Sequence, residues 1–327
     1  MSFPLEAARP VLSVVVPCFN EAEVLPAFHA RLSAVMEALG ETWELVCVND
    51  GSRDDTWRVM GTLADADPRV ALVDLSRNFG KEIALTAGLD HARASGAVVV
   101  IDADLQDPPE VIPELVAVWR EGIDMVYARR RVRDGESWFK RATASAFYRV
   151  IGRLGHKVEI PADSGDFRLL SRRALDELLR LREHHRFMKG LFAWVGFPSR
   201  AVLYDRAPRA AGQTSWNYWS LWNFAIEGIT GFTVVPLKIA TYLGLAVALA
   251  AILFGGQLIG RTLLFGNPVP GYPSLMAVVL FLGGVQLMTL GVIGEYLGRI
   301  SNETKNRPLY VLQDVRPARL EAIGRPV

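Results

Sequence analysis

Short apolar runs rich in β-branched residues alternate with helical stretches along the first hundred residues of the chain. The runs occupy residues 12–17, 43–50, 70–76 and 97–104, and the helical stretches occupy residues 21–39, 54–66 and 81–95, with Asn20 placed to cap the first helix. Strands that alternate with helices predict a mostly parallel sheet covered by helices on both faces. The expected fold class of this part is therefore α/β.

A different pattern begins near residue 239, where charged side chains almost disappear. Residues 239–260 and 262–294 are uncharged, and the second stretch is broken by GNPVPGYPS at residues 266–274. About 20 apolar residues at a rise of roughly 1.5 Å span a hydrocarbon core of about 30 Å. We therefore predict a transmembrane hairpin with helices at about 239–265 and 274–297. The alternative is a buried hairpin in a soluble protein, whose helices seldom stay apolar on every side at this length.

The charges that flank the hairpin predict its orientation. The turn between the two helices contains no Lys or Arg, whereas Lys238 precedes the first helix and Arg299, Lys305 and Arg307 follow the second. The positive-inside rule then places both termini in the cytoplasm, in a multi-pass protein of the inner (plasma) membrane. Residues 1–10 contain no apolar stretch, so no signal peptide is expected.

An aromatic-rich segment lies directly before the hairpin, at residues 215–236. Trp and Tyr concentrate at the headgroup level of membranes, so we expect this segment to lie in the membrane interface; an aromatic core helix is the alternative. The chain accordingly divides into a cytoplasmic domain at 1–205, an interfacial segment at 206–238, the hairpin at 239–298 and a cytoplasmic tail at 299–327.

Composition and charge argue against several classes of protein. The 327 residues allow one large domain or two small ones, and the net charge of +1 gives no electrostatic reason to expect nucleic acid as a partner. The two cysteines, Cys18 and Cys47, lack CxxC spacing, which argues against a disulfide framework and a zinc site. We expect both to be structural residues in the reduced cytosol.

Carboxylates and amides follow the predicted strands. Asn20-Glu21, Asn49-Asp50 and Asp102-Ala103-Asp104 end the first, second and fourth runs, and Ser76-Arg77-Asn78 ends the third. In parallel sheets, ligands bind beyond the carboxyl ends of the strands. The sequence therefore predicts a cleft lined with acidic and amide side chains.

This cleft does not match the common nucleotide-binding motifs. No G-x-G-x-x-G follows the first strand, and the Gly80-Lys81 pair has Leu75 where a P-loop needs its first glycine. Dehydrogenases and P-loop NTPases are therefore excluded. An acidic cleft that still holds an anionic nucleotide implies Mg²⁺ or Mn²⁺ between the two, and Asp102 and Asp104 suit such an ion if the chain turns between them.

The chain also carries a series of motifs in a fixed order. They are VVVPCFNE (14–21), VNDGSRDDT (48–56), LSRNFGKEIALTAGLD (75–90), DADLQDPPE (102–110), GDFRLLSRRALD (165–176), RFMKGLFAWVGF (186–197), YDRAPRAAGQTSW (204–216) and GEYLGRISNETKNRPLY (294–310). In these the chain resembles the inverting family 2 glycosyltransferases with a GT-A fold, in the membrane-anchored branch that contains bactoprenol glucosyltransferases and dolichol-phosphate mannose synthases. The resemblance implies transfer of a sugar from a nucleotide-sugar donor to a polyprenyl phosphate acceptor, such as undecaprenyl phosphate, on the cytoplasmic leaflet.

The resemblance also implies roles for individual residues. Nucleoside contacts fall on Pro17, Glu21 and Asp50; metal contacts on Asp102, Asp104 and Gln106; catalysis on Asp104 and Asp166; and acceptor-phosphate contacts on Arg129, Arg141, Ser145, Arg168 and Arg209. Simpler interpretations remain open, since Asp50 suits an Asx turn, the arginines at 129–131 suit a solvated charge run, and Asp166 suits a helix cap. Gln213-Thr214-Ser215-Trp216 departs from the family pattern, in which a Lys commonly follows the Ser or Thr.

Other functions and several details stay open at this stage. A processive polysaccharide synthase would carry Q-x-x-R-W and more membrane spans, and a non-catalytic membrane scaffold would be expected to lack metal carboxylates. UDP-glucose is the expected donor, with a UDP-linked formamido-arabinose or GDP-mannose as alternatives. Glycine pairs in the hairpin favour a homo-oligomer, with a tetramer as one option, and a separate flippase is a further expected partner.

Overall fold

A computed structural model describes residues 9–131, 164–184, 186–205, 235–265 and 271–320 of the chain. It forms two compact units, which are described separately. The first combines Met1–Trp222 with Pro308–Val327, and the second is Asn223–Arg307.

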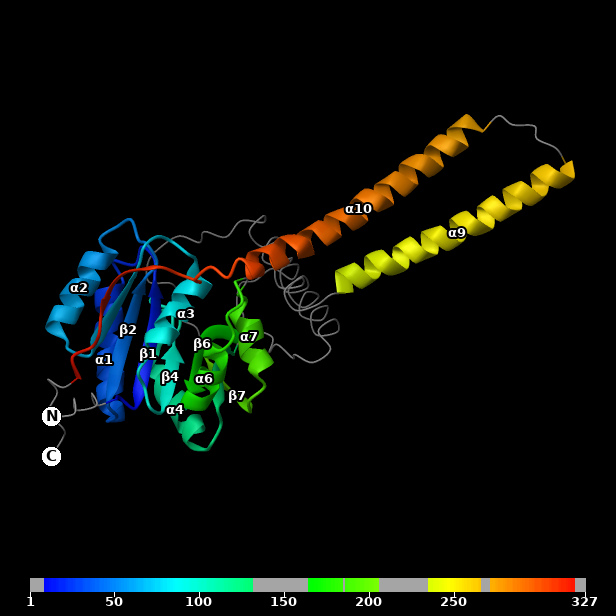
Figure 1. The fold of residues 1–327 in the computed structure, drawn as a ribbon. Helices are drawn as coiled ribbons and strands as arrows, with labels where there is room; N and C mark the ends of the chain where they lie inside the picture. Colours follow the sequence, from blue (N-terminus) through cyan, green and yellow to red (C-terminus); the bar gives the residue numbers. More distant parts are fainter. Residues whose placement is uncertain (1–8, 132–163, 185, 206–234, 266–270, 321–327) are drawn as a thin grey trace, which may run out of the picture. The chain divides into compact units, whose positions relative to one another are not determined.

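An eight-stranded sheet forms the centre of the described part of the first unit (Figure 1). Its strands are β1 (Leu12–Cys18), β2 (Trp43–Asn49), β3 (Val70–Leu75), β4 (Ala97–Val100), β5 (Met125–Arg130), β6 (Ser164–Ser171), β7 (Ser199–Tyr204) and β8 (Leu312–Arg316), in the order β7-β5-β6-β4-β1-β2-β3-β8. Strands β1 to β4 pair in parallel, and β6 and β8 run against their neighbours. The predicted α/β class with a mostly parallel sheet is confirmed.

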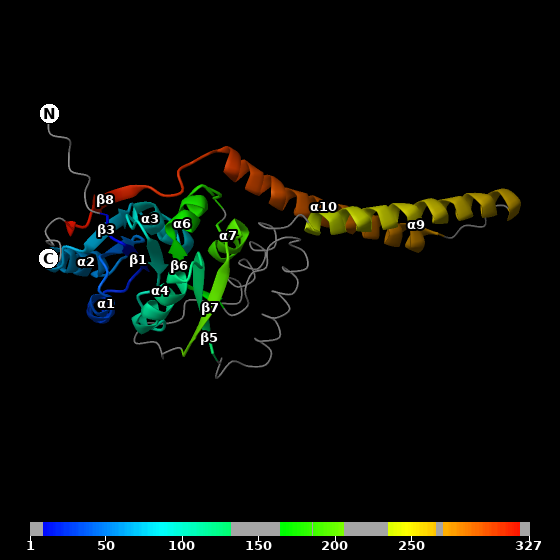
Figure 2. The ribbon, with the colours of Figure 1, turned by 90° about the horizontal axis from the view of Figure 1, so that it is seen from below.

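Helices cover both faces of this sheet, as the alternating pattern predicts. Helices α3 (Lys81–His91), α6 (Arg172–Leu179) and α7 (Met188–Val195) pack on one face, and α1 (Leu25–Leu39), α2 (Thr56–Ala66) and α4 (Ile112–Arg120), which follows the 3-10 turn η1 (Pro109–Val111), pack on the other. Figure 2 shows α3, α6 and α7 on the opposite side of the strands from α1 and α4. Because β1 is covered on both sides, its apolar run is almost continuous and buried. Cys18 and Cys47 are free and buried in this core, in keeping with the expected structural role.

The start of α1 differs from the prediction. Helix α1 begins at Leu25 with Val24 as its cap residue, so Asn20 is not the N-cap. Asn20 has a φ of 57°, and its Oδ1 accepts a hydrogen bond from the Arg53 backbone N–H at 2.8 Å. The side chain thus joins the loops after β1 and β2, and Pro26 in the first turn suits the later start of the helix.

The C-terminal segment was expected to be a separate tail, yet part of it completes the sheet. Strand β8 pairs antiparallel with β3 at the sheet edge. The Tyr310 hydroxyl donates to Asp90 Oδ2 at 2.8 Å, and the Arg319 backbone N–H donates to the Pro68 carbonyl at 2.7 Å. All five side chains of β8 are exposed, and its sequence LQDVR does not alternate between apolar and polar residues. The pattern that usually indicates a strand is therefore missing.

The second unit consists of two long helices, α9 (Val235–Phe265) and α10 (Tyr272–Thr304). Within them, Ala240–Gln257 and Phe281–Thr304 are long and apolar enough to cross a membrane, and neither window is buried in the structure. Residues 266–270 of the predicted turn, and residues 206–234 of the predicted interfacial segment, lie outside the described residues. Two apolar helices thus fit the predicted hairpin, although α9 begins at Val235 and α10 continues to Thr304, beyond the predicted bounds.

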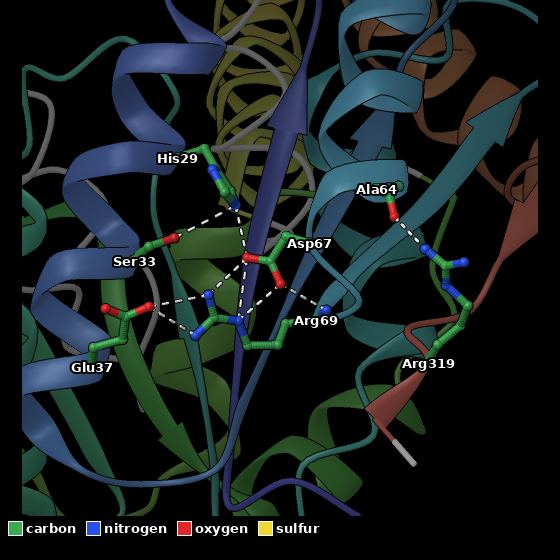
Figure 3. Close-up of polar contacts among 7 residues, drawn as sticks. All are labelled: His29, Ser33, Glu37, Ala64, Asp67, Arg69 and Arg319. Atoms are coloured by element: carbon green, nitrogen blue, oxygen red, sulfur yellow. Dashed lines mark hydrogen bonds and ion pairs between the residues drawn. The ribbon is translucent and has the colours of Figure 1, made fainter. Parts of the chain in front are cut away.

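A buried ionic cluster joins α1 to the turn before β3 (Figure 3). Asp67 is 6% exposed, and its carboxylate contacts His29 Nε2 at 3.0 Å and accepts a hydrogen bond from Arg69 Nε at 2.9 Å. Arg69 also donates to Glu37 at 3.2 Å and stacks on Trp43. Ser33 and Asp67 both contact the same His29 nitrogen, so these three residues do not form a Ser-His-Asp catalytic relay. The cluster is therefore structural.

Asp67→Asn is expected to lower the free energy of unfolding by about 2 kcal/mol at pH 7, since it leaves the partly buried guanidinium of Arg69 with the exposed carboxylate of Glu37 in place of the buried one. Burial raises the pKa of Asp67, but the bonds from Arg69 and His29 outweigh it and hold the pKa below its ordinary value. The stabilisation is therefore present above the unfolded pKa of about 4 and is lost as the pH falls through the folded pKa. Denaturant unfolding of the detergent-solubilised protein at pH 7 and pH 3.5 measures this difference.

Asp55→Asn provides the control, because Asp55, the residue before α2, forms an exposed pair with Arg58 and such pairs contribute little. An Asp67→Asn deficit of the same size at both pH values would contradict the assigned ion pair.

Candidate active site

The polar residues predicted to line a cleft gather at the carboxyl edge of the parallel strands. Pro17 lies next to the end of β1 in register with Val48 of β2, and the Asp50 backbone N–H donates to the Cys18 carbonyl at 2.9 Å. The Glu21 backbone N–H donates to Thr56 Oγ1 at 2.9 Å, which holds the loop after β1 against the start of α2. The structure therefore brings the three predicted nucleoside residues, Pro17, Glu21 and Asp50, to one edge of the sheet.

Asp50 organises the loop that leads into α3. Its carboxylate is 3% exposed and accepts hydrogen bonds from the backbone N–H groups of Phe79 at 2.7 Å and Gly80 at 3.0 Å. Burial raises the pKa of Asp50, and these two bonds oppose that shift. The neighbouring Asn49 makes the side-chain-to-backbone contact of this loop, since its Oδ1 accepts a hydrogen bond from the Ser52 N–H, three residues on, at 3.1 Å. Gly51, at φ +64°, packs so closely on the Asn78 backbone that a Cβ would lie 2.4 Å from its nitrogen.

The loop after β4 carries the predicted metal ligands. Leu105 has a φ of 58°, an uncommon value for a branched side chain, and this turn follows Asp104 directly. Asp104 is buried, and its Oδ1 accepts a hydrogen bond from the Gln106 backbone N–H at 3.1 Å. The chain also turns at residues 103 and 104, so the bend that the prediction requires between Asp102 and Asp104 is present.

These residues suit a divalent ion held by few protein ligands. Among the residues that the structure describes, no group of three or more His, Cys, Asp or Glu side chains lies close enough to enclose a metal. Mg²⁺ in nucleotide sites commonly takes one or two carboxylates and completes its shell with water and phosphate oxygens. Asp102 and Asp104 have that composition, and Gln106, two residues further along the chain, would add an amide oxygen.

Lys81 is the residue that joins the two acidic parts of the site. Its Nζ lies 2.7 Å from Asp102 Oδ2 and 2.9 Å from Asp166 Oδ2, so one ammonium bridges the loop after β4 and the start of β6. Burial lowers the pKa of Lys81, but the two carboxylates outweigh it and raise the pKa above its ordinary value. In this state the ammonium supplies the positive charge that the two carboxylates need.

Asp166 lies near the start of β6, which runs antiparallel to β4 and so begins at the carboxyl edge. Burial raises the pKa of Asp166, but Lys81, Lys189 and Arg168 together lower it to about 2. Its Oδ1 is buried and has no hydrogen-bond partner among the described residues. Asp166 is therefore an ionised carboxylate whose Oδ1 accepts from none of the described residues.

Arg168 contacts the backbone at the start of β6, next to Asp166. It is 6% exposed, donates from Nη2 to the Gly165 carbonyl at 2.8 Å, and stacks on the Phe192 ring at 3.7 Å. Burial lowers its pKa to about 10. These contacts hold the backbone around Asp166, and the acceptor-phosphate role of Arg168 stays a prediction.

Glu82 is a further acidic group beside this cluster. Its Oε2 accepts a hydrogen bond from the Met188 backbone N–H at 3.3 Å, which ties the start of α3 to the start of α7. Burial and the nearby charge of Asp166 raise the pKa of Glu82 to about 7, against the opposing effect of Lys81 and Lys189. Asp166 and Glu82 are thus two neighbouring carboxyl groups with well-separated pKa values.

The predicted acceptor-phosphate residues are placed only in part. Arg129 is exposed near the end of β5, in register with Ser164 two residues before Asp166. Its neighbour Arg131 lies 3.6 Å from Asp205, so part of the arginine run is paired. Arg141, Ser145 and Arg209 lie outside the described residues, and their roles stay predictions.

The sequence prediction missed Lys81, Glu82 and Tyr204, whose hydroxyl donates to Asp107. One signal for Lys81 was available. The N-terminus of a helix favours acidic side chains, so a Lys at the first position of α3 opposes the helix dipole and indicates another use for its charge. No comparable signal marks Tyr204, since its partner Asp107 lies in the loop after β4, far away in the sequence.

Comparison with known proteins shows the family to which the chain belongs. The model of "Glycosyl transferase family 2" matches residues 13–179, and that of the "GtrB C-terminal hairpin" matches residues 235–300. An uncharacterized glycosyltransferase of Synechocystis sp. is 54% identical over 304 residues, which cover 93% of this chain and 95% of the relative. The SfII prophage-derived bactoprenol glucosyl transferase of Shigella flexneri is 48% identical, over 92% of this chain and 97% of its own. A prophage bactoprenol glucosyl transferase homolog of Escherichia coli is 47% identical, over 93% of this chain and 99% of its own. The chain belongs to glycosyl transferase family 2.

Proposed function

We propose that this protein transfers glucose from UDP-glucose to a polyprenyl phosphate, with inversion at the anomeric carbon. Of two relatives that match nearly the whole chain, one is named a bactoprenol glucosyl transferase and the other a bactoprenol glucosyl transferase homolog, which supports the acceptor class and the sugar. The structural observation that carries the proposal is the pair of carboxylates, Asp102 and Asp166, held together by Lys81 at the carboxyl edge of the sheet. Such an acidic cluster suits two anionic substrates when a divalent cation lies between its carboxylates and the donor diphosphate, as the proposal requires.

The acceptor needs little activation by the protein. The second pKa of a phosphate monoester is near 6, so at pH 7 the lipid phosphate is mostly dianionic and already nucleophilic. One of its oxygens attacks the anomeric carbon, the bond from that carbon to the UDP oxygen breaks, and UDP leaves with the electron pair. No proton has to be removed from the attacking oxygen, so Asp166 orients a substrate hydroxyl and does not act as the base.

Asp102, Asp104 and Gln106 would hold Mg²⁺ or Mn²⁺ on the donor diphosphate, where the ion would act as a Lewis acid and neutralise the leaving group. Lys81 would then remain paired with Asp166 and place its charge near the same diphosphate. Arg129, Arg141, Ser145 and Arg209 would bind the acceptor phosphate, and Pro17, Glu21 and Asp50 would line the nucleoside pocket.

The membrane arrangement follows from the hairpin. Helices α9 and α10 would span the inner membrane, with the catalytic unit and both termini in the cytoplasm, as the basic residues around the hairpin favour. The product, a lipid-linked glucose, would form on the cytoplasmic leaflet. A homo-oligomer and a separate flippase are part of this proposal.

A donor panel tests it. Purified protein in detergent is incubated with undecaprenyl phosphate, Mn²⁺ or Mg²⁺, and UDP-glucose, UDP-galactose, UDP-GlcNAc or GDP-mannose, and the glycolipid is identified by mass spectrometry. The expected product is undecaprenyl phosphate glucose from UDP-glucose, formed only when metal is present, and NMR of the product is expected to show the β-anomer from the α-linked donor. A lipid product from another donor would contradict the sugar assignment, and a product formed equally well in EDTA would contradict the metal assignment.

A further inference from the structure

Tyr204 lies at the meeting point of segments that carry the site residues. It ends β7 and is 5% exposed. Its hydroxyl donates to Asp107 Oδ1, in the loop that carries Asp104. The Phe167 ring, which follows Asp166 in β6, packs edge-to-face on the Tyr204 ring at 6.0 Å. Arg130, at the end of β5, is the third neighbour, and its Nε lies 3.5 Å from the Tyr204 hydroxyl.

Asp107 is an unusual partner for this hydroxyl. The carboxylate is 4% exposed, and within the described residues the hydroxyl of Tyr204 is the hydrogen-bond donor that the structure gives it. A buried carboxylate usually needs an opposite charge or several donors, because leaving water is costly. Burial and the charge of Asp107 raise the pKa of the Tyr204 phenol to about 12, so the hydroxyl keeps its proton and remains a donor.

The position of Asp107 in the chain gives this contact its importance. The turn from Asp102 to Asp107 contains the residues proposed to hold the metal, and Leu105 within it has the left-handed φ of 58°. Such a turn persists only where the surrounding structure fixes it. Asp104 is oriented by a contact within the turn, from the Gln106 N–H, whereas the Tyr204 hydroxyl fixes the far end of the turn to the rest of the fold.

We propose that Tyr204 is a positioning residue for the metal-binding turn, and that its hydrogen bond to Asp107 sets the place of Asp102 and Asp104 for a divalent cation and the donor diphosphate. The inference rests on the proposed metal-dependent function. Neither Tyr204 nor Asp107 touches the reacting atoms in this scheme. Partners that orient metal ligands commonly change metal affinity by about 10- to 100-fold when they are removed.

Binding of UDP in the presence of Mn²⁺, measured by isothermal titration calorimetry on the full chain in detergent, tests the proposal. Tyr204→Phe removes one oxygen atom and is expected to weaken Mn²⁺-dependent UDP binding by about 10-fold. Asp107→Ala, which removes the other half of the same bond, is expected to give the same loss. Asp107→Asn keeps an oxygen that accepts from Tyr204, and is expected to bind within about threefold of the unmodified protein.

Tyr310→Phe is the matched control, because it removes a phenol-to-carboxylate hydrogen bond of the same kind, to Asp90, at the edge of the sheet. Both phenylalanine variants are expected to lower the thermal midpoint, and only Tyr204→Phe is expected to lower Mn²⁺-dependent UDP binding. Equal binding by Tyr204→Phe and the unmodified protein, or an equal loss in Tyr310→Phe, would overturn the inference alone. Unmodified protein that binds UDP equally well with and without Mn²⁺ would instead overturn the metal dependence of the proposed function.

Discussion

Asp104→Asn is expected to lower kcat/KM for glucosyl transfer by about 10³-fold at saturating Mn²⁺. The change keeps the size of the side chain and the oxygen that accepts from the Gln106 N–H, so the turn is expected to stay folded. It removes one of two carboxylates proposed to hold the ion on the diphosphate. Electrostatic stabilisation of a leaving group by a bound ion is worth several kcal/mol, and about 1.4 kcal/mol corresponds to each factor of ten.

The measurement is the initial rate of lipid-linked glucose formation over a range of Mn²⁺ concentrations. Asp65→Asn, on the exposed surface of α2, removes the same charge away from the site and is expected to keep the full rate. Wild-type turnover by Asp104→Asn at saturating Mn²⁺ would show that the ion, if it is needed, binds elsewhere.

The sheet and its acidic edge were predictable because they follow from local pattern and topology. Apolar runs mark the strands, and parallel pairing necessarily brings their carboxyl ends together, so residues as distant in sequence as Asp50 and Asp102 reach one edge. The hairpin was predictable for a similar reason, since two long uncharged stretches need only their own length and composition to be recognised.

The missed features depend on contacts that local pattern does not encode. Strand β8 has exposed side chains throughout and forms through backbone pairing with the edge of β3, which no periodicity announces. The hydrogen bond between Tyr204 and Asp107 joins residues far apart in the chain. The prediction for Asn20 was wrong because an Asn before a helix suits an N-cap as well as a loop contact. Only the fold shows that the Arg53 backbone N–H donates to its Oδ1.

Lys81 shows the same limit within the site itself. The sequence pattern predicts Lys81 at the start of a helix, and the residue served only in the argument against a P-loop. In the structure its ammonium lies between two carboxylates. Asp102 and Asp166 are therefore close neighbours that depend on a third charge. That charge is Lys81 in the present state, and the proposed metal would share the task when donor binds.

Lys81→Met is accordingly expected to have two opposite effects. It leaves two partly buried carboxylates facing each other, so the thermal midpoint in EDTA at pH 7.5 is expected to fall, because uncompensated charges destabilise the folded state. Mn²⁺ with UDP is expected to raise the midpoint by more than it does in the unmodified protein, since the ion then restores the missing positive charge. Glucosyl transfer is nevertheless expected to fall by about 100-fold, because the lost ammonium no longer orients Asp166 or faces the diphosphate.

The two effects are measured on the same preparation, by thermal unfolding with EDTA or with Mn²⁺ and UDP, and by the rate of lipid-linked glucose formation. Lys305→Met, at the exposed end of α10, removes a lysine outside the cluster and is expected to change neither measurement. If Lys81 only filled space in the fold, its loss would lower the midpoint by the same amount with and without Mn²⁺ and UDP. A larger stabilisation by Mn²⁺ and UDP in Lys81→Met, together with the slower transfer, would instead identify the ammonium as the charge that the acidic cluster uses when no metal is bound.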